Sequence, residues 1–288
     1  MPGYIPYEAM MARLSGPEGP FEEMRKFPER FYVHPVRIIK DLYYVGDKAV
    51  CMHLIDTGDG LILIDGGYPT NRALLVNAIW EAGFNPNNIK YLILTHEHYD
   101  HFGAADFFRT MYGCKIVASA PTADVLQNHP ERAMIDNQHT YLEPCKVDVI
   151  VNDGDVLELG SVKLKMLLTP GHGEGVLTFL FDMTDDDGKT YRCALFGGAT
   201  TVTMYKKHLK KYGIRMSILE DFPNSLKRLH SEKVDIVLGN HPRQNDTLGK
   251  IARMKDGEPN PWIDPTEWDR FLDNTLAMFR DFEAQDID

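Results

Sequence analysis

The stretch YLILTHEHYDH at residues 91–101 joins an apolar strand pattern directly to a cluster of side chains that can bind metal. Its second half places His96, His98, Asp100 and His101 within six residues. Imidazole nitrogens and carboxylate oxygens bind divalent metals such as zinc at roughly 2.0–2.2 Å. A tight loop at a strand end can aim His96 and His98 at one ion and Asp100 and His101 at a second. The stretch therefore predicts a metal centre at the end of a strand.

The order His96-x-His98-x-Asp100-His101 matches the signature of the metallo-β-lactamase superfamily residue for residue, and the chain resembles this family over most of residues 35–285. The resemblance implies a third histidine on the first metal, His172 in the turn TPGHG at 169–173. It also implies that His241, after the apolar run at 234–238, joins Asp100 and His101 on the second metal. The expected cofactor is a pair of zinc ions.

The chain departs from many members of this family at FGGAT, residues 196–200, where they carry a metal-binding Asp or Cys. Gly198 has no side chain and cannot bind metal. The branches with a bridging carboxylate, such as glyoxalase II and the acyl-homoserine lactonases, are therefore less similar than the third subclass of metallo-β-lactamases. That subclass implies a substrate-carboxylate contact for Thr200. Tyr99 is expected to line the pocket, and Asp65 to fix a ligand loop.

The resemblance and the ligand set predict a dinuclear zinc-dependent hydrolase in which a metal-bound hydroxide opens a β-lactam amide. Asp100 is expected to position the nucleophile as well as to bind metal. One alternative is a cytoplasmic zinc hydrolase of lactones or thioesters. Another is an iron-dependent oxidoreductase of the same fold, although its flavodiiron branch normally carries Glu where this chain has His98. A non-enzymatic metal-binding protein is disfavoured because all six ligands are present.

Composition narrows the class of partner. The chain has 288 residues, 43% of them hydrophobic, and a formal net charge of −11 from 31 Lys+Arg and 42 Asp+Glu. An acidic protein is a poor match for nucleic acid, so a small-molecule substrate is expected, and a homo-oligomer stays open. The basic run at 206–211 is predicted to be a solvated helix face or a loop at the mouth of the site. The remaining histidines are predicted to be ordinary: His34, His53, His129, His139, His208 and His230.

Neither a membrane span nor a secretion signal is visible, which predicts a cytoplasmic protein, or a periplasmic or secreted one if a leader has been removed. The four cysteines are widely spaced and are predicted to be reduced, mostly buried thiols: Cys51, Cys114, Cys145 and Cys193.

The pattern of elements predicts an N-terminal extension over 1–33 and a single domain over 34–288. Strand patterns cover 36–45, 49–56, 61–65, 91–94, 146–151, 156–159, 162–168, 175–182, 191–196 and 234–238. Helix patterns cover 71–82, 102–111 and 218–230, and another helix opens at Asp264-Pro265. Helices between runs of mostly antiparallel strands predict an α+β fold. The expected architecture is the αββα sandwich of the metallo-β-lactamases, two mixed sheets face to face with helices on the outer faces.

Overall fold

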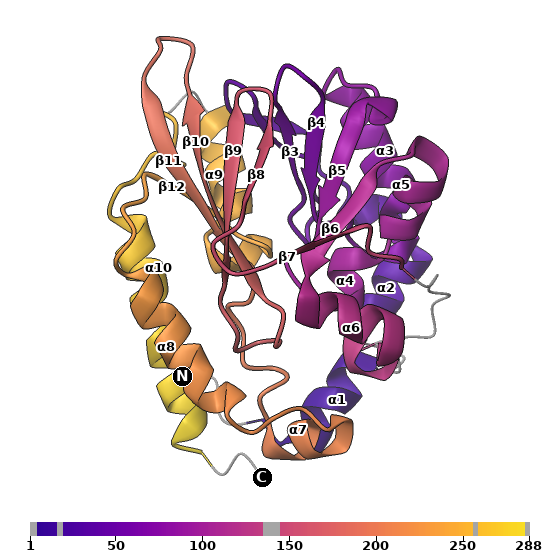
Figure 1. Cartoon of the computed structure of the whole chain (residues 1–288), viewed down its shortest axis with the longest axis vertical. Helices are drawn as coiled ribbons and strands as arrows, with labels where there is room; N and C mark the ends of the chain where they lie inside the picture. The colour runs from indigo at the N-terminus through magenta and orange to yellow at the C-terminus, as the bar shows by residue number, and fades with distance from the viewer. Residues whose placement is uncertain (1–4, 16–19, 135–144, 256–258, 286–288) are drawn as a thin grey trace.

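The computed structural model describes residues 5–15, 20–134, 145–255 and 259–285 of the chain. Two β-sheets lie face to face in the middle of the molecule, and helices cover the outer face of each sheet (Figure 1). The predicted α+β sandwich with an αββα arrangement of layers is therefore confirmed.

The first sheet has seven strands in the order of the sequence. Its first three pairings are antiparallel and its last three are parallel. The parallel pairings need crossover connections, which here contain helices. The strands are β1 (Val36–Ile39), β2 (Leu42–Tyr44), β3 (His53–Asp56), β4 (Leu61–Ile64), β5 (Ile89–Ile93), β6 (Lys115–Ser119) and β7 (Val149–Val151).

The second sheet has five strands in the order β12-β11-β10-β9-β8, and only its β11–β12 pairing is parallel. The prediction of mostly antiparallel neighbours is thus right for this sheet and for one half of the other. The strands are β8 (Val156–Leu159), β9 (Val162–Leu168), β10 (Leu177–Thr184), β11 (Thr190–Phe196) and β12 (Ile236–Leu238).

The central strands of the two sheets are buried on both faces, and the strand β4 shows how the sequence allows this. Successive side chains of a strand point to opposite faces. Ile62 and Ile64 belong to the core between the two sheets, whereas Leu61 and Leu63 face the helices on the outer side. A continuous apolar run such as LILI is typical of a strand that is covered on both sides.

The outer helices fall into two groups. Helices α3, α5 and α6 cover the first sheet, and α8 and α10 cover the second, with α7 at one end (Figure 1). Gly113 ends α5 in the left-handed conformation that glycine tolerates best, as its position after a helix pattern predicts. The helices are α1 (Tyr7–Ser15), α2 (Pro20–Lys26), α3 (Arg72–Glu81), α4 (Tyr99–Phe102), α5 (Ala105–Tyr112), α6 (Ala120–Asn128), α7 (Lys206–Tyr212), α8 (Ile218–Leu229), α9 (Thr247–Lys255) and α10 (Glu267–Glu283).

Several element boundaries differ from the predicted ones. The run at 36–45 is two strands, because residues 40–41 form a turn between β1 and β2. The strand expected from Ala49 begins only at His53, because the preceding residues form an irregular turn. Helix α10 begins at Glu267 rather than at Pro265, since the Asp264 carboxylate accepts the Thr266 N–H (2.9 Å) in a turn before the helix. Strand β6 and helices α6 and α9 were not predicted.

The N-terminal segment packs against the end of the sandwich where α7 lies (Figure 1). The Tyr7 hydroxyl is 3.2 Å from the His208 Nδ1 atom, and the Tyr205 hydroxyl donates to the Ile5 carbonyl oxygen (2.8 Å). The basic run at 206–211 is therefore part of a helix, and His208 is buried in it.

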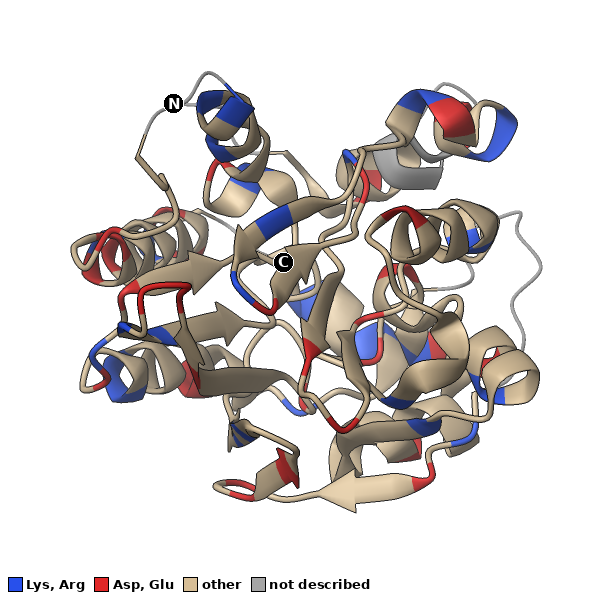
Figure 2. Ribbon diagram, turned by 90° about the horizontal axis from the view of Figure 1, so that it is seen from above, with Lys and Arg blue, Asp and Glu red and all other residues tan. Residues whose placement is uncertain are grey.

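Basic and acidic residues are both spread over the molecule (Figure 2). Helix α7 is an exception, because it carries four lysines and no acidic residue. All four cysteines are free and buried, as predicted. Within the described ranges, no helix is both long and apolar enough to cross a membrane. One predicted ordinary histidine, His139, lies outside the described residues.

A buried ion pair fastens α9 to α10 and gives a first testable prediction. The Lys250 Nζ atom is 2.7 and 2.6 Å from the two carboxylate oxygens of Glu267, and the two side chains are 4% and 9% exposed. We expect Lys250→Met to lower the free energy of unfolding in urea by about 3–5 kcal/mol, because a buried carboxylate loses its counter-charge.

The matched control is Lys163→Met, in the exposed pair with Glu158, whose side chains are 72% and 60% exposed. Exposed pairs contribute about 0–1 kcal/mol. Equal losses in the two variants would contradict a stabilising role for the buried pair.

Candidate metal centre

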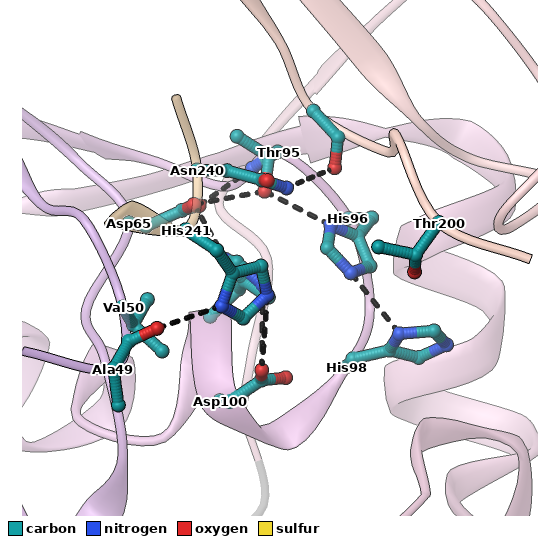
Figure 3. Close-up of polar contacts among 12 residues, drawn as sticks. Ala49, Val50, Asp65, Thr95, His96, His98, Asp100, Thr200, Asn240 and His241 are labelled. Atoms are coloured by element: carbon teal, nitrogen blue, oxygen red, sulfur yellow. Dashed lines mark hydrogen bonds and ion pairs between the residues drawn. The ribbon is translucent and has the colours of Figure 1, made fainter. Parts of the chain in front are cut away.

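Three loops that carry the predicted ligands meet at one end of the two sheets (Figure 3). Residues 95–101 follow β5, His172 lies between β9 and β10, and His241 follows β12. The Leu177 N–H donates to the Thr95 carbonyl oxygen (2.8 Å), so the two sheets are joined at this point. Strand ends from both sheets therefore converge on one small region.

The first group of ligands is His96, His98 and His172, which we call the first trio. One ring nitrogen of each lies within 4.8 Å of the others, and all three residues are buried. The His96 Nε2 and His98 Nδ1 atoms are 3.1 Å apart. Two nitrogens bound tetrahedrally at 2.0–2.1 Å would lie about 3.3 Å apart, so the spacing fits one zinc ion.

The second group is Asp100, His101 and His241, the second trio, whose ligand atoms also lie within 4.8 Å of one another. Helix α4 starts at Tyr99, and its single turn carries Asp100 and His101, whose ring lies 4.2 Å from that of His96 in the first trio and 5.1 Å from that of His241. The Asp100 Oδ2 atom lies 3.6 Å from His101 Nε2 and 3.5 Å from His241 Nε2. His101 Nε2 is buried and has no hydrogen-bond partner among the described residues, as expected of an atom that binds metal.

Most of these histidines also use their second ring nitrogen. A hydrogen bond at that atom fixes the ring orientation and leaves the other nitrogen for metal, as is usual at metal centres. The contacts are those of His96 Nδ1 with the Thr95 hydroxyl (3.0 Å), His101 Nδ1 with Asp65 (2.7 Å), His172 Nδ1 with the Thr200 carbonyl (3.0 Å) and His241 Nδ1 with the Ala49 carbonyl (2.8 Å). The donor set and its support therefore fit two divalent ions.

Asp65 lies beneath the second trio at the end of β4. Its backbone φ angle is +61°, a left-handed conformation that Asp tolerates better than most residues. Its carboxylate accepts the Thr95 N–H (2.7 Å), the Thr95 hydroxyl (2.8 Å) and the His101 Nδ1 proton (2.7 Å). This geometry fits the predicted role of holding the ligand loop.

Thr200 and Tyr99, the two residues expected to contact substrate, both lie where they contact other side chains of the protein. The Thr200 hydroxyl is 3.1 Å from His172 Nδ1, so it helps to hold that ring. Tyr99 is 4% exposed, and its ring packs 5.4 Å from that of Tyr68 inside the core beneath the first sheet. Contact of either residue with substrate stays a prediction.

Glu97 lies between His96 and His98 in the sequence but belongs to neither trio. It is 5% exposed, and its carboxylate accepts the Thr122 hydroxyl (2.8 Å). Burial raises the pKa of this carboxyl. Sequence reasoning missed the Ala49 carbonyl, because a backbone acceptor leaves no mark in residue type.

Gly198 explains why no further ligand lies between the trios. A Cβ atom at this position would lie 2.8 Å from the His172 Cβ and 2.9 Å from a Val176 methyl group. An Asp or Cys side chain there would push the His172 ring away from its trio. The departure noted in the sequence is therefore built into the packing of the site.

The metal-free protein is expected to lose stability in mild acid. Burial lowers the pKa of His172 to about 3 and that of His241 to about 4. It also lowers to about 3 the pKa of His53, whose ring nitrogens have no hydrogen-bond partner among the described residues. The unfolded chain takes up protons below a pH of about 6.5, whereas the folded chain keeps these rings neutral.

As the pH falls from 6.5 to 5, protonation of each such histidine in the unfolded chain should therefore lower the free energy of unfolding by roughly 2 kcal/mol. Urea titrations of the metal-free protein at pH 7.5 and 5.0 measure the sum. His53→Leu, outside both trios, should reduce the difference by the share of one histidine. A pH dependence that is unchanged by His53→Leu would contradict burial of a neutral ring at that position, and the raised pKa of His101 beside Asp100 and Asp65 offsets part of the total loss.

The family of this chain follows from a comparison with known proteins. Residues 45–184 match the model of the metallo-beta-lactamase superfamily. The chain contains a metallo-beta-lactamase superfamily domain. This agrees with the signature at residues 96–101 and with the αββα arrangement.

Solved structures match this chain over most of its length. BJP-1, a subclass B3 metallo-beta-lactamase from Bradyrhizobium japonicum, is 27% identical, with a TM-score of 0.78 over 88% of this chain and 95% of that protein. FEZ-1, a metallo-beta-lactamase from Legionella gormanii, is 29% identical, with a TM-score of 0.81 over 89% and 97%. The predicted similarity to the third subclass is confirmed at the level of structure.

Curated relatives share shorter stretches. A hydroxyacylglutathione hydrolase from Bradyrhizobium is 31% identical over 108 residues, which is 38% of this chain and 34% of that protein. The probable polyketide biosynthesis zinc-dependent hydrolase PksB from Bacillus subtilis is 24% identical over 161 residues, 56% of this chain and 61% of PksB. The chain thus matches only about a third of the length of the first of these relatives. These names support the predicted hydrolase class but not one substrate.

Proposed function

We propose that this protein is a dinuclear zinc-dependent hydrolase that opens the amide bond of a β-lactam ring. The observation that carries the proposal is the pair of trios with no bridging carboxylate at Gly198. Glyoxalase II-like sites need such a carboxylate, and here His172 and Val176 occupy the space for it. The two structural relatives named above, which match this chain over nearly their whole length, are both metallo-beta-lactamases.

The first trio would hold one zinc ion and the second trio the other. Bound zinc supplies Lewis-acid polarisation of a carbonyl group and lowers the pKa of water toward ~7. The chain supplies the orientation of the ligands. Asp65 and the carbonyl groups of Ala49 and Thr200 keep the ligand nitrogens unprotonated and directed inward.

Asp100 is the residue to which we assign a catalytic role. Its Oδ2 atom faces both rings of the second trio, and its side chain is 14% exposed. The other oxygen, Oδ1, is then left to accept a proton from the attacking water and to orient it. A carboxylate in this position can act in binding and in proton transfer at once.

A second candidate function is hydrolysis of a thioester or lactone. The observation that favours it is the similarity to hydroxyacylglutathione hydrolases over 108 residues. The C–S bond of a thioester and the C–O bond of a lactone are hydrolysed more easily than the C–N bond of an amide, so the same ligand set could act on such a substrate. Substrate preference therefore separates the two candidates.

The first experiment measures metal content and hydrolysis on the same purified protein. Chelation with EDTA is expected to remove ~99% or more of the hydrolysis, and added Zn²⁺ should restore it, because the proposed nucleophile is a water activated by metal at the two trios. Nitrocefin tests the β-lactam proposal, and an S-acylglutathione tests the thioester candidate.

Zinc in the protein with metal-dependent turnover of nitrocefin would support the proposal. Turnover of the thioester alone would move the function to the second candidate. Iron in place of zinc would favour the oxidoreductase alternative, and hydrolysis that survives EDTA unchanged would contradict both hydrolase proposals.

A further inference from the structure

The turn at residues 47–50 contacts the second trio from outside. Asp47 forms an isolated β-bridge with Tyr32, and residues 48–50 lie outside helices and strands. The Asp47 carboxylate closes the turn, because its Oδ1 atom accepts the Ala49 N–H (2.7 Å) and the Val50 N–H (2.8 Å). The Asp47 N–H also donates to the Val50 carbonyl oxygen (3.0 Å). The Asp47 side chain therefore supplies the two hydrogen bonds to the N–H groups of Ala49 and Val50, while the Lys48 N–H donates to the Phe31 carbonyl oxygen (2.9 Å).

This turn is docked on the loop that carries His241. The Cys51 N–H donates to the Asn240 carbonyl oxygen (3.0 Å), and the Ala49 carbonyl oxygen is 2.8 Å from His241 Nδ1 (Figure 3). A carbonyl group can only accept a hydrogen bond, so His241 Nδ1 carries the proton. The Nε2 atom is then unprotonated and faces Asp100.

Asp47 is itself held from the other side. It is 3% exposed, and its Oδ2 atom accepts from the Asn71 side-chain amide (2.5 Å). Asn71 lies at the start of α3 and is also buried. No described cation forms an ion pair with Asp47, so the hydrogen bonds to the turn and to Asn71 account for its burial.

We propose that Asp47 is a positioning residue for His241: it shapes the 47–50 turn so that the Ala49 carbonyl fixes the His241 ring with Nε2 directed at the second trio. This inference rests on the proposed function only for the identity of the metal. The connection between the Asp47 carboxylate and the His241 ring follows from the hydrogen bonds of the turn. Outer partners of metal ligands typically change metal affinity by ~10–100-fold when they are removed.

The test compares Asp47→Ala with Asp47→Asn in the full chain. Asparagine keeps an oxygen that accepts the two turn N–H groups, and Asn71 can rotate its amide to present an acceptor to the new NH₂ group. Alanine keeps neither contact. The negative charge is lost in both variants, so a difference between them reports the turn rather than the field of the charge.

The first readout is titration of the metal-free protein with Zn²⁺. For Asp47→Ala we expect the Zn²⁺ ion at the second trio to bind at least ~10-fold more weakly, and the ion at the first trio to bind as in the parent. For Asp47→Asn we expect both affinities to stay within ~3-fold of those of the parent. The matched control is Asp185→Ala, which removes a similar carboxylate that accepts the Asp187 and Lys189 N–H groups in the β10–β11 hairpin. The control should leave both affinities unchanged.

The second readout needs neither metal nor activity. Nitrogen NMR of the imidazole rings in the metal-free protein should show His241 as the Nδ1–H tautomer in the parent and in Asp47→Asn, but a mixture in Asp47→Ala. A parent protein that binds no Zn²⁺ would defeat the proposed function, and the tautomer would still decide the role of Asp47.

Two results would overturn the inference. One is an Asp47→Ala protein with the tautomer and affinities of the parent, and the other is an Asp47→Asn protein that is impaired as much as Asp47→Ala. If Asp47→Ala does not fold, Asp47→Ser takes its place, because its hydroxyl can accept one turn N–H but does not reach Asn71. An intermediate loss of affinity would then support the inference, and no loss would overturn it.

Discussion

Asp100→Asn is expected to lower the rate of hydrolysis by ~10³-fold or more and to release the metal ion of the second trio. Asp100 is the only carboxylate among the six ligands. The asparagine side chain has nearly the same shape as the aspartate side chain, but its amide is a poor metal ligand and cannot accept a proton from water. Metal analysis after dialysis and the kcat for nitrocefin measure the two effects on one sample.

Two control variants accompany this prediction. Asp106→Asn, one helix further along the chain, changes the same chemical group outside both trios and should keep metal and rate. His98→Ala should instead release the ion of the first trio. An Asp100→Asn protein with full metal content and near-parent kcat would contradict the assignment of Asp100 as ligand and as catalytic residue.

Asp65→Asn is expected to reduce hydrolysis strongly while it lowers the stability of the fold only moderately. The new NH₂ group faces His101 Nδ1, which now donates to the carboxylate at 2.7 Å. The ring should therefore switch to the tautomer with its proton on Nε2, the atom that faces Asp100. We expect a loss of hydrolysis of ~10²-fold or more at a cost of about 1–3 kcal/mol in the free energy of unfolding.

Asp65→Ala provides the comparison. It removes three buried hydrogen bonds and places alanine at a φ angle of +61°, so the free energy of unfolding should fall by about 3–5 kcal/mol. Urea unfolding measures this term, and ring NMR of His101 measures the tautomer. Equal stability losses in the two variants, with hydrolysis retained in Asp65→Asn, would contradict the proposed role.

The candidate ligands could be recognised in the sequence because most of them are close together in the chain, and the structure gathers them into two trios. Four of the six lie within residues 96–101, and the other two follow strand patterns that are visible as apolar runs. The hydrogen-bond partners that orient these side chains could not be predicted in the same way. The acceptors for His172 and His241 are backbone carbonyl groups of Thr200 and Ala49, which any residue type could supply.

The fold was predictable in its layers but less so in its boundaries. Doubly buried strands such as β4 have unmistakable apolar runs, whereas β6 begins with an exposed lysine and passes directly into α6. The predicted strand over 36–45 failed to show its turn, because residues 40–41 contain neither Gly nor Pro. Local patterns fail where long-range contacts decide the ends of an element.

The meeting of three distant loops at the metal centre has a consequence for the order of events during synthesis. His241 and the Ala49 carbonyl that orients it are 192 positions apart, and each trio joins an early ligand to a late one. A nascent chain that ends before β12 can offer only part of the second trio. Tight binding of the proposed second ion would therefore require both sheets to be packed together, so it would stabilise a chain that has already folded rather than start its folding.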